Sequence, residues 1–177
     1  MRVVAGTARG IRLVAPAGHD TRPTSDRVRE ATFNALGSLG AVEDARVVDL
    51  FAGTGALGIE ALSRGAAHAT FVERERAALD AIERNLEATG LGDRATVVRA
   101  DVTRHLETQG TYDLALVDPP YAFDGWASVL DRLEADIAVA ESDRAIEPPE
   151  PWAMLRSRRY GTTVVTIVRR KFDTRIT

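Results

Sequence analysis

The sequence predicts an α/β fold, with helices flanking a mostly parallel β-sheet, an antiparallel hairpin at the C-terminal end and a short N-terminal β-hairpin extension. Strand and helix signals alternate through the middle of the chain, which is typical of parallel strands joined by right-handed crossovers. A glycine-rich stretch, residues 53–58, joins an apolar run to a helical pattern. A length of 177 residues suits one domain with a small appendage.

The N-terminal part of the chain predicts a hairpin followed by a helix. Residues 2–14 contain two short apolar runs around glycines, which indicates a β-hairpin. A Pro-Thr pair then precedes a helical spacing of apolar residues over 25–39. We therefore divide the chain into a β-hairpin extension, residues 1–20, and a main domain, residues 21–177.

The remaining elements follow from apolar periodicity and from the glycines that end each pattern. Gly65 and Gly90 each end a helical pattern, in which apolar residues recur at intervals of three and four. Residues 155–160 and 162–168 flank Gly161 and predict the C-terminal antiparallel hairpin. The predicted strands of the middle are residues 46–50, 69–72, 95–99 and 112–117, and its predicted helices are residues 55–64, 75–89 and 126–133.

The composition excludes several kinds of site. The sequence has no cysteine, which rules out disulfides and thiolate metal sites. Its three histidines, His19, His68 and His105, are scattered, and we therefore expect no metal centre. No apolar run is long enough to span a membrane, and the first residues have too little apolar length for a signal peptide. We expect a cytoplasmic protein.

Residues 49–58 combine a strand end, a glycine-rich loop and a helix start, as nucleotide-binding folds do. Gly53, Gly55 and Gly58 form a literal G-x-G-x-x-G. Glycine lets the backbone approach a ligand closely because no Cβ is in the way. In a dinucleotide fold the helix start would hold a pyrophosphate, so NAD is one candidate ligand.

Three carboxylates follow successive strands and are expected to line one crevice, since ligands of such sheets bind beyond the carboxyl ends of the strands. Asp49 lies before the glycine loop, where its charge would repel a pyrophosphate and suit a cationic amino-acid group. Glu73 could accept hydrogen bonds from ribose hydroxyls, and Asp101 from an adenine amino group. S-adenosylmethionine offers these groups together. The alternative is that each acid only caps a loop or a helix.

Asp118, Pro119, Pro120 and Tyr121 come directly after the apolar run 114–117. The prolines cannot continue that strand because neither supplies an N–H. The Asp118 carboxylate and the Pro119 carbonyl are therefore presented together, with an aromatic ring next to them. Two acceptors beside a stacking surface suit a planar substrate with an NH2 group, such as a nucleobase. The alternative is a plain turn, with the tyrosine packed in the core.

Positive charge gathers at the two ends of the chain, although the net charge is −3. Residues 1–30 carry six arginines against three acids, and residues 156–177 carry six arginines and one lysine against one acid. This asymmetry predicts a polyanion bound by the ends, the alternative being arginines that only solvate the surface. The arginines expected to contact RNA phosphates are Arg9, Arg12, Arg22, Arg27 and Arg29.

Taken together, the motifs resemble a known family. Residues 49–55, Glu73, Asp101 and residues 118–121, in this order, are similar to class I S-adenosylmethionine-dependent methyltransferases that act on amino groups. Further motifs resemble the RsmD family, which methylates N2 of a guanine in the 16S ribosomal RNA of the small subunit. The stretches that carry this resemblance are residues 1–10, 21–30, 57–66 and 160–163.

The resemblance implies a Rossmann-like class I methyltransferase sheet, in which residues 136–140 serve as the fifth strand. It implies a guanine-N2 methyltransferase of 16S ribosomal RNA, free or within an assembling small subunit, and we expect a monomer. S-adenosyl-L-methionine is the implied cofactor and S-adenosyl-L-homocysteine its product. The implied catalytic residues are Asp118, Pro119, Pro120 and Tyr121, and the implied cofactor-binding residues are Asp49, Phe51, Ala52, Gly53, Thr54, Gly55, Glu73, Arg74, Asp101, Val102 and Asp118.

Three other functions stay open from the sequence. An adenine-N6 methyltransferase acting on DNA or RNA would use the same cofactor, and residues 118–121 suit either amine. An NAD-dependent oxidoreductase would use the glycine loop, but Asp49 disfavours a pyrophosphate. A non-catalytic RNA-binding factor would explain the basic ends of the chain but not the four residues shaped for an amine.

Overall fold

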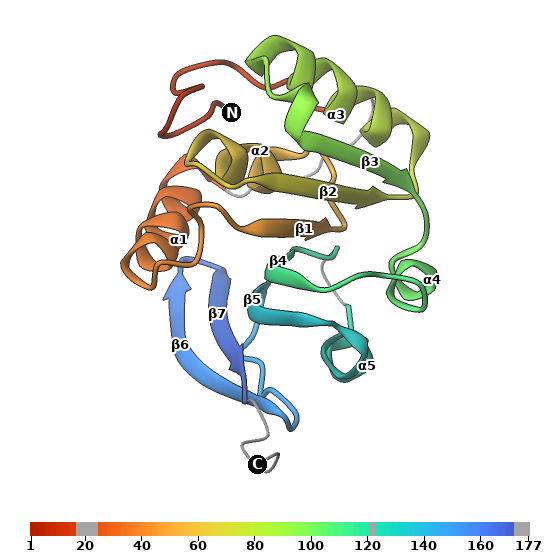
Figure 1. Ribbon diagram of the computed structural model, residues 1–177. Helices are drawn as coiled ribbons and strands as arrows, with labels where there is room; N and C mark the ends of the chain where they lie inside the picture. The colour runs from red at the N-terminus through yellow and green to blue at the C-terminus, as the bar shows by residue number, and fades with distance from the viewer. Residues whose placement is uncertain (17–24, 121–122, 172–177) are drawn as a thin grey trace.

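A seven-stranded sheet forms the centre of the computed structural model, which describes residues 1–16, 25–120 and 123–171 (Figure 1). Its strands are β1 (Arg46–Leu50), β2 (His68–Glu73), β3 (Ala95–Arg99), β4 (Tyr112–Val117), β5 (Ala135–Ser142), β6 (Trp152–Tyr160) and β7 (Thr163–Arg170). They lie in the order β3-β2-β1-β4-β5-β7-β6. β1 to β5 are parallel, whereas β7 is antiparallel to β5 and to β6. The predicted fold class is confirmed.

Helices cover both faces of the sheet (Figure 1). The helices of the described residues are α1 (Asp26–Ser38), α2 (Ala56–Ser63), α3 (Arg76–Thr89), α4 (Val102–Leu106) and α5 (Trp126–Arg132), with a 3-10 turn, η1 (Gly92–Arg94). One core lies under α1, α2 and α3 and contains Phe33, Leu62 and Ile82. A second core lies under α4 and α5 and contains Leu106 and Leu130. None of these helices has both the length and the apolar character needed to cross a membrane.

β4 lies between two parallel strands and is buried on both faces, which is why residues 114–117 form an unbroken apolar run. Val117 is level with Leu50 of β1 on one side and with Ala140 of β5 on the other. The three strands run the same way, so the residues that follow each of them emerge at one edge of the sheet. Asp118 therefore lies between the glycine loop and the end of β5.

Two of the central elements differ from the prediction. β5 continues two residues past the predicted 136–140 at its carboxyl end, and it lies inside the sheet, between β4 and β7. α4 was not predicted, because a five-residue helix is too short to show a helical period. Both differences affect the edge of the sheet at which ligands bind.

The N-terminal segment doubles back on itself, but the two predicted strands within residues 2–14 are wrong. The segment has a single antiparallel bridge, between Arg2 and Arg12. The Val3 N–H donates to the Ile11 carbonyl at 3.0 Å, and the Gly10 N–H donates to the Val3 carbonyl at 2.9 Å. Bends and turns occupy residues 5–10, and the segments on either side of them pair only at this bridge and form no regular strand.

The buried carboxylate of Glu60 fixes this segment over α2. Its two oxygens accept hydrogen bonds from the N–H groups of Val4 and Ala5, at 2.8 and 3.0 Å. Arg29 and Arg64 balance the charge, at 3.6 and 2.7 Å from the carboxylate oxygens. A buried carboxylate requires such partners, and the N-terminal end of the chain is thereby held at the sheet edge described below.

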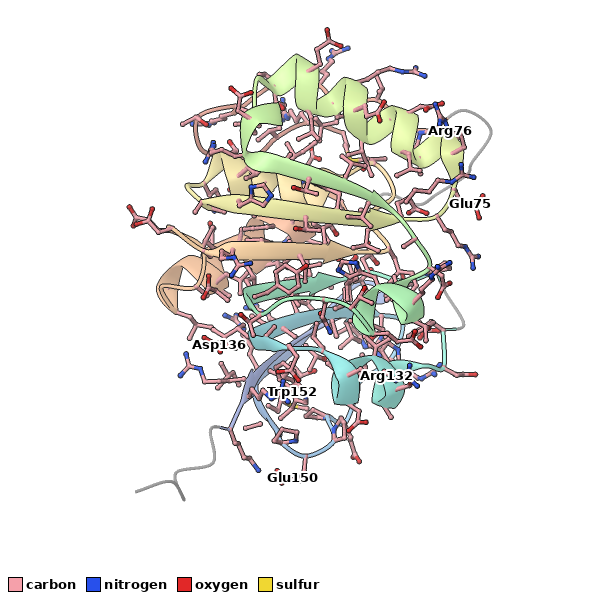
Figure 2. All side chains as sticks on the ribbon, turned by 45° about the vertical axis from the view of Figure 1, so that its right-hand side comes forward. Glu75, Arg76, Arg132, Asp136, Glu150 and Trp152 are labelled. Atoms are coloured by element: carbon pink, nitrogen blue, oxygen red, sulfur yellow. The ribbon has the colours of Figure 1, made fainter. Side chains whose placement is uncertain are left out.

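Trp152 joins the C-terminal hairpin to α5 (Figure 2). Its indole N–H donates to the Leu130 carbonyl at 2.8 Å, and the guanidinium of Arg170 lies 5.9 Å from the centre of its ring. The side chain is 3% exposed. In Figure 2 it lies far from Glu75, which marks the start of α3.

Candidate active site

A cavity of about 780 Å³ opens at the carboxyl ends of the parallel strands. It brings together predicted residues that are far apart in the sequence. The predicted residues that line it are Asp49, Phe51, Ala52, Gly53, Thr54, Glu73, Arg74, Asp101, Val102, Asp118, Pro119 and Pro120. Gly55 does not line the cavity but caps the start of α2. Tyr121 lies outside the described residues.

The glycine loop turns sharply from β1 into α2. Phe51, Gly53 and Gly55 all have positive φ angles, of 60°, 56° and 75°. Gly58 acts differently from the first two glycines, because a Cβ on it would lie 2.4 Å from the Phe71 ring. The third glycine of the motif therefore allows α2 to pack closely on β2, while the first lies in the wall of the cavity.

Asp49 is the most deeply buried acid of the cavity, at 1% exposure. One carboxylate oxygen accepts the Gly58 N–H at 2.9 Å, which ties the end of β1 to the first turn of α2. The pKa of Asp49 is raised from 3.8 to about 8, chiefly by burial, while the Gly58 hydrogen bond lowers it and the nearby charge of Glu73 raises it. A cation that enters the cavity would favour the charged form.

Glu73 holds two backbone segments at once. One of its carboxylate oxygens accepts the Gly53 N–H at 2.9 Å. The other accepts the N–H groups of Arg74 and Glu75, at 2.7 and 2.9 Å, and so fixes the chain just before α3. A carboxylate offers about four acceptor positions, so these three bonds leave capacity for a ligand hydroxyl on the cavity side.

Asp101 and Arg74 form the rim of the cavity. Asp101 caps α4, since its carboxylate accepts the Thr103 N–H at 2.9 Å. Arg74 lies between two acids, 3.7 Å from Asp101 and 3.3 Å from Glu75. Capping and ligand binding are compatible here, because Asp101 remains exposed at the cavity edge. Val102, directly after it, is buried and adds apolar surface.

The residues after β4 face the glycine loop across the cavity. Asp118 is half-buried and Pro119 is buried. The Asp118 N–H donates to the Leu50 carbonyl at 3.5 Å, a long hydrogen bond at the end of the ladder between β4 and β1. The strand thus stops at the first proline, as expected, and the Asp-Pro-Pro segment lines the same cavity as Phe51.

Three aromatic rings line one side of the cavity. The ring centres of Phe51 and Phe123 are 5.2 Å apart, and those of Phe123 and Trp126 are 5.4 Å apart, both in edge-to-face contact. Such contacts fix the rings and add stability beyond burial alone. Phe51 belongs to the predicted site, whereas Phe123 and Trp126 do not.

Comparisons with known proteins identify the family. A family model described as "Conserved hypothetical protein 95" matches residues 1–169. The chain belongs to this family. The Bacillus subtilis protein named "Putative rRNA methyltransferase YlbH" is 39% identical over 97% of this chain and 100% of its own length. The "Ribosomal RNA small subunit methyltransferase D" of Escherichia coli K12 is 35% identical over 97% of this chain and 90% of its own length.

A solved structure agrees with the family assignment. The structure named "Putative methyltransferase yhhF from Escherichia coli" has a TM-score of 0.85 and 33% sequence identity, and the match covers 98% of this chain and 99% of that one. The resemblance to the RsmD family is confirmed, and the family is one of methyltransferases.

In this member of the RsmD family, the end of β5 contributes residues that the sequence interpretation missed. Glu141, Ser142 and Asp143 line the cavity, as do Met1 and Pro16 of the N-terminal segment. The position of Glu141 was open to prediction, since it lies at the carboxyl end of a parallel strand, and Asp118 directly follows another. The interpretation ended that strand too early. Nothing in the local sequence pattern indicated that the N-terminal segment reaches the cavity.

The predicted RNA-binding arginines fall into three groups. Arg9, Arg12 and Arg27 are exposed, so they are available to a partner. Arg22 lies outside the described residues. The prediction that Arg29 contacts RNA is wrong, because Arg29 is fully buried and pairs with Asp26 at 2.9 Å and with Glu60. Its guanidinium balances a buried carboxylate and does not reach the surface.

Proposed function

We propose that this protein transfers a methyl group from S-adenosyl-L-methionine to the exocyclic N2 of a guanine in 16S ribosomal RNA. The observation that carries the proposal is that the Asp-Pro-Pro segment and the glycine loop line one cavity. The name of the Escherichia coli relative supports the substrate, since that protein is named a small-subunit ribosomal RNA methyltransferase.

The residues of the cavity fit the proposed cofactor. The methionine part carries an ammonium group, and Asp49 at the buried end of the cavity is a carboxyl whose ionisation a cation would favour. Glu73 keeps acceptor capacity for ribose hydroxyls, and Asp101 at the rim can accept from an adenine amino group. When bound, the cofactor supplies an activated methyl group.

Asp118 and Pro119 would prepare the amine of the base. An aromatic amine is a weak nucleophile, because its lone pair is delocalised into the ring. Hydrogen bonds from the amine to the Asp118 carboxylate and the Pro119 carbonyl would favour a more tetrahedral nitrogen, with its lone pair directed at the methyl group. Positive charge develops on that nitrogen during transfer, and the carboxylate is near enough to stabilise it. Asp118 or a water molecule then takes the proton.

The base must leave its stack to reach this cavity. We propose that Tyr121 stacks on the extruded base, which is worth about 1–3 kcal/mol in comparable sites. Arg9, Arg12 and Arg27 are proposed to contact backbone phosphates, which orient an RNA without reading its sequence.

The test compares the nucleosides of 16S ribosomal RNA after incubation with the protein and S-adenosylmethionine. Mass spectrometry is expected to detect N2-methylguanosine. Asp118→Ala should still bind S-adenosylhomocysteine and yield no methylated nucleoside. Asp93→Ala, which removes an exposed carboxylate on η1, is the matched control and should retain transfer.

Three results would contradict the proposal. N6-methyladenosine as the product would favour the adenine alternative. Binding of NAD without binding of S-adenosylhomocysteine would favour an oxidoreductase. Unchanged transfer by Asp118→Ala would remove that carboxylate from the mechanism.

A further inference from the structure

A second hollow, of about 460 Å³, is lined by residues from the start of α1 and from the turn that joins β6 to β7. We refer to it as the basic hollow. Its lining residues are Ser25, Arg27, Val28, Arg158, Arg159, Tyr160 and Gly161. Three of these seven are arginines and none is an acid, so the hollow attracts anions.

The arginines of the basic hollow are exposed and carry no carboxylate partner among the described residues. Asp26, which precedes Arg27 in the sequence, forms ion pairs with Arg29 at 2.9 Å and with Arg2 at 3.6 Å. Exposed arginines elsewhere, such as Arg76 and Arg144, do have acid partners. The positive charge of the basic hollow is therefore available to an external anion.

Two of these arginines are held in place. The guanidinium of Arg158 lies 5.5 Å from the centre of the Tyr160 ring, a contact that restrains it. Arg159 donates to the Asp143 carbonyl at 3.5 Å. A restrained guanidinium loses less freedom when it binds, and its planar fork of donors matches the oxygens of a phosphate group.

The basic hollow adjoins the candidate active site. Gly161 lines the hollow and Thr163 lines the cavity, and two residues of chain span at most about 7 Å. Asp143, which accepts the hydrogen bond from Arg159, also lines the cavity. An RNA strand whose base enters the cavity would therefore pass over the hollow with its backbone.

We propose that the basic hollow binds a backbone phosphate of the RNA strand next to the methylated nucleotide, and so holds the strand while the base is extruded. This inference rests on the proposed function, since it takes the RNA substrate from there. It assigns a phosphate-binding role to Arg158 and Arg159 of the β6–β7 hairpin, and it gives Arg27 a defined place in the complex.

The experiment uses the full chain and an unmodified 16S ribosomal RNA transcript. Arg27→Gln/Arg158→Gln is compared with Arg84→Gln/Arg169→Gln, which makes the same change in net charge on the outer surface of α3 and at the far end of β7. The first variant is expected to bind RNA about 10-fold to 100-fold more weakly. The slope of log affinity against log salt should also fall in magnitude by about 0.7, for one phosphate of a single strand that is no longer neutralised.

Kinetics and cofactor binding complete the test. The KM for RNA should rise in the first variant, while its affinity for S-adenosylhomocysteine stays that of the wild type. RNA affinity and salt slope equal to those of the control pair would overturn the proposal. If the wild type transfers no methyl group to RNA, the proposed function fails, whereas the binding comparison still decides whether the hollow holds phosphate.

Discussion

The side-chain amide of Asn85 donates a hydrogen bond to the backbone carbonyl of Thr54, at 2.9 Å, and so ties α3 to the glycine loop. The same amide group donates to the Val14 carbonyl at 3.0 Å, and its oxygen accepts the Val14 N–H at 2.8 Å. Asn85 is 1% exposed. One buried side chain thus joins the glycine loop, α3 and the N-terminal segment, all of which meet at the cavity.

Asn85→Ala should lower both stability and cofactor affinity. The variant leaves the buried Thr54 carbonyl and the part-buried backbone groups of Val14 without their Asn85 partner, and a buried unsatisfied group costs about 1–3 kcal/mol. We expect the free energy of unfolding in urea to fall by at least about 2 kcal/mol, and S-adenosylhomocysteine to bind more weakly by calorimetry. Arg84→Ala, one residue earlier on the exposed side of α3, should stay within about 0.5 kcal/mol of the wild type. Equal effects of the two variants would contradict this role.

Arg29 and Arg27 lie two residues apart on α1 and should respond in opposite ways. Arg29→Ala leaves the buried Glu60 carboxylate with one cation fewer, and we expect a loss of about 3–5 kcal/mol in the free energy of unfolding. Arg27→Ala removes an exposed side chain, so stability should change by about 0.5 kcal/mol or less, while RNA affinity falls. A stable Arg29→Ala protein with weakened RNA binding would restore Arg29 as a phosphate contact.

The central sheet was predictable because each of its strands carries its own signal. Residues 114–117 of β4 are all apolar since they are buried, and Gly65 and Gly90 mark where helices stop. The N-terminal segment was not predictable in the same way. It is held by Glu60, more than fifty residues away, and such a contact has no trace in local periodicity.

The candidate site likewise contains residues that the sequence predicts and residues that it does not. Residues at the ends of β1, β2, β3 and β4 were found because parallel strands bring their carboxyl ends to one edge. The place of Phe123 in the site was missed, because a single phenylalanine in a loop forms no sequence pattern that predicts its contact with Phe51. Arg29 was misassigned for the opposite reason, because arginine is buried so rarely that exposure was the natural expectation.

Asp49 should make stability depend on pH. Its pKa is raised from 3.8 to about 8 in the folded protein, so between pH 4 and 8 the folded state keeps a proton that the unfolded state releases. The free energy of unfolding should therefore fall as pH rises through this window, by about 1.4 kcal/mol per pH unit from this group. Asp49→Asn removes the group and should flatten the profile in urea unfolding at pH 5, 6, 7 and 8. Parallel profiles would contradict the raised pKa.

The same group should link cofactor binding to protons. A ligand ammonium next to Asp49 favours the carboxylate, so binding of S-adenosylhomocysteine below pH 8 should release a proton, and affinity should rise with pH. Calorimetry in two buffers of different ionisation enthalpy measures the proton released. Binding by the wild type without proton release would show that the ammonium group lies elsewhere in the cavity.

Alanine at two helical glycines should change stability in opposite directions. At Gly37 of α1 a Cβ meets nothing within 4 Å, and Gly37→Ala should raise the free energy of unfolding by about 0.5–1 kcal/mol, through helix propensity alone. At Gly58 of α2 a Cβ would lie 2.4 Å from the Phe71 ring and 3.1 Å from an Asp49 oxygen. Gly58→Ala should therefore lower it by about 1–3 kcal/mol, and weaken S-adenosylhomocysteine binding as Asp49 shifts. Thermal unfolding and calorimetry of both variants measure these effects, and a stabilised Gly58→Ala would show that the motif's third glycine is not needed for packing.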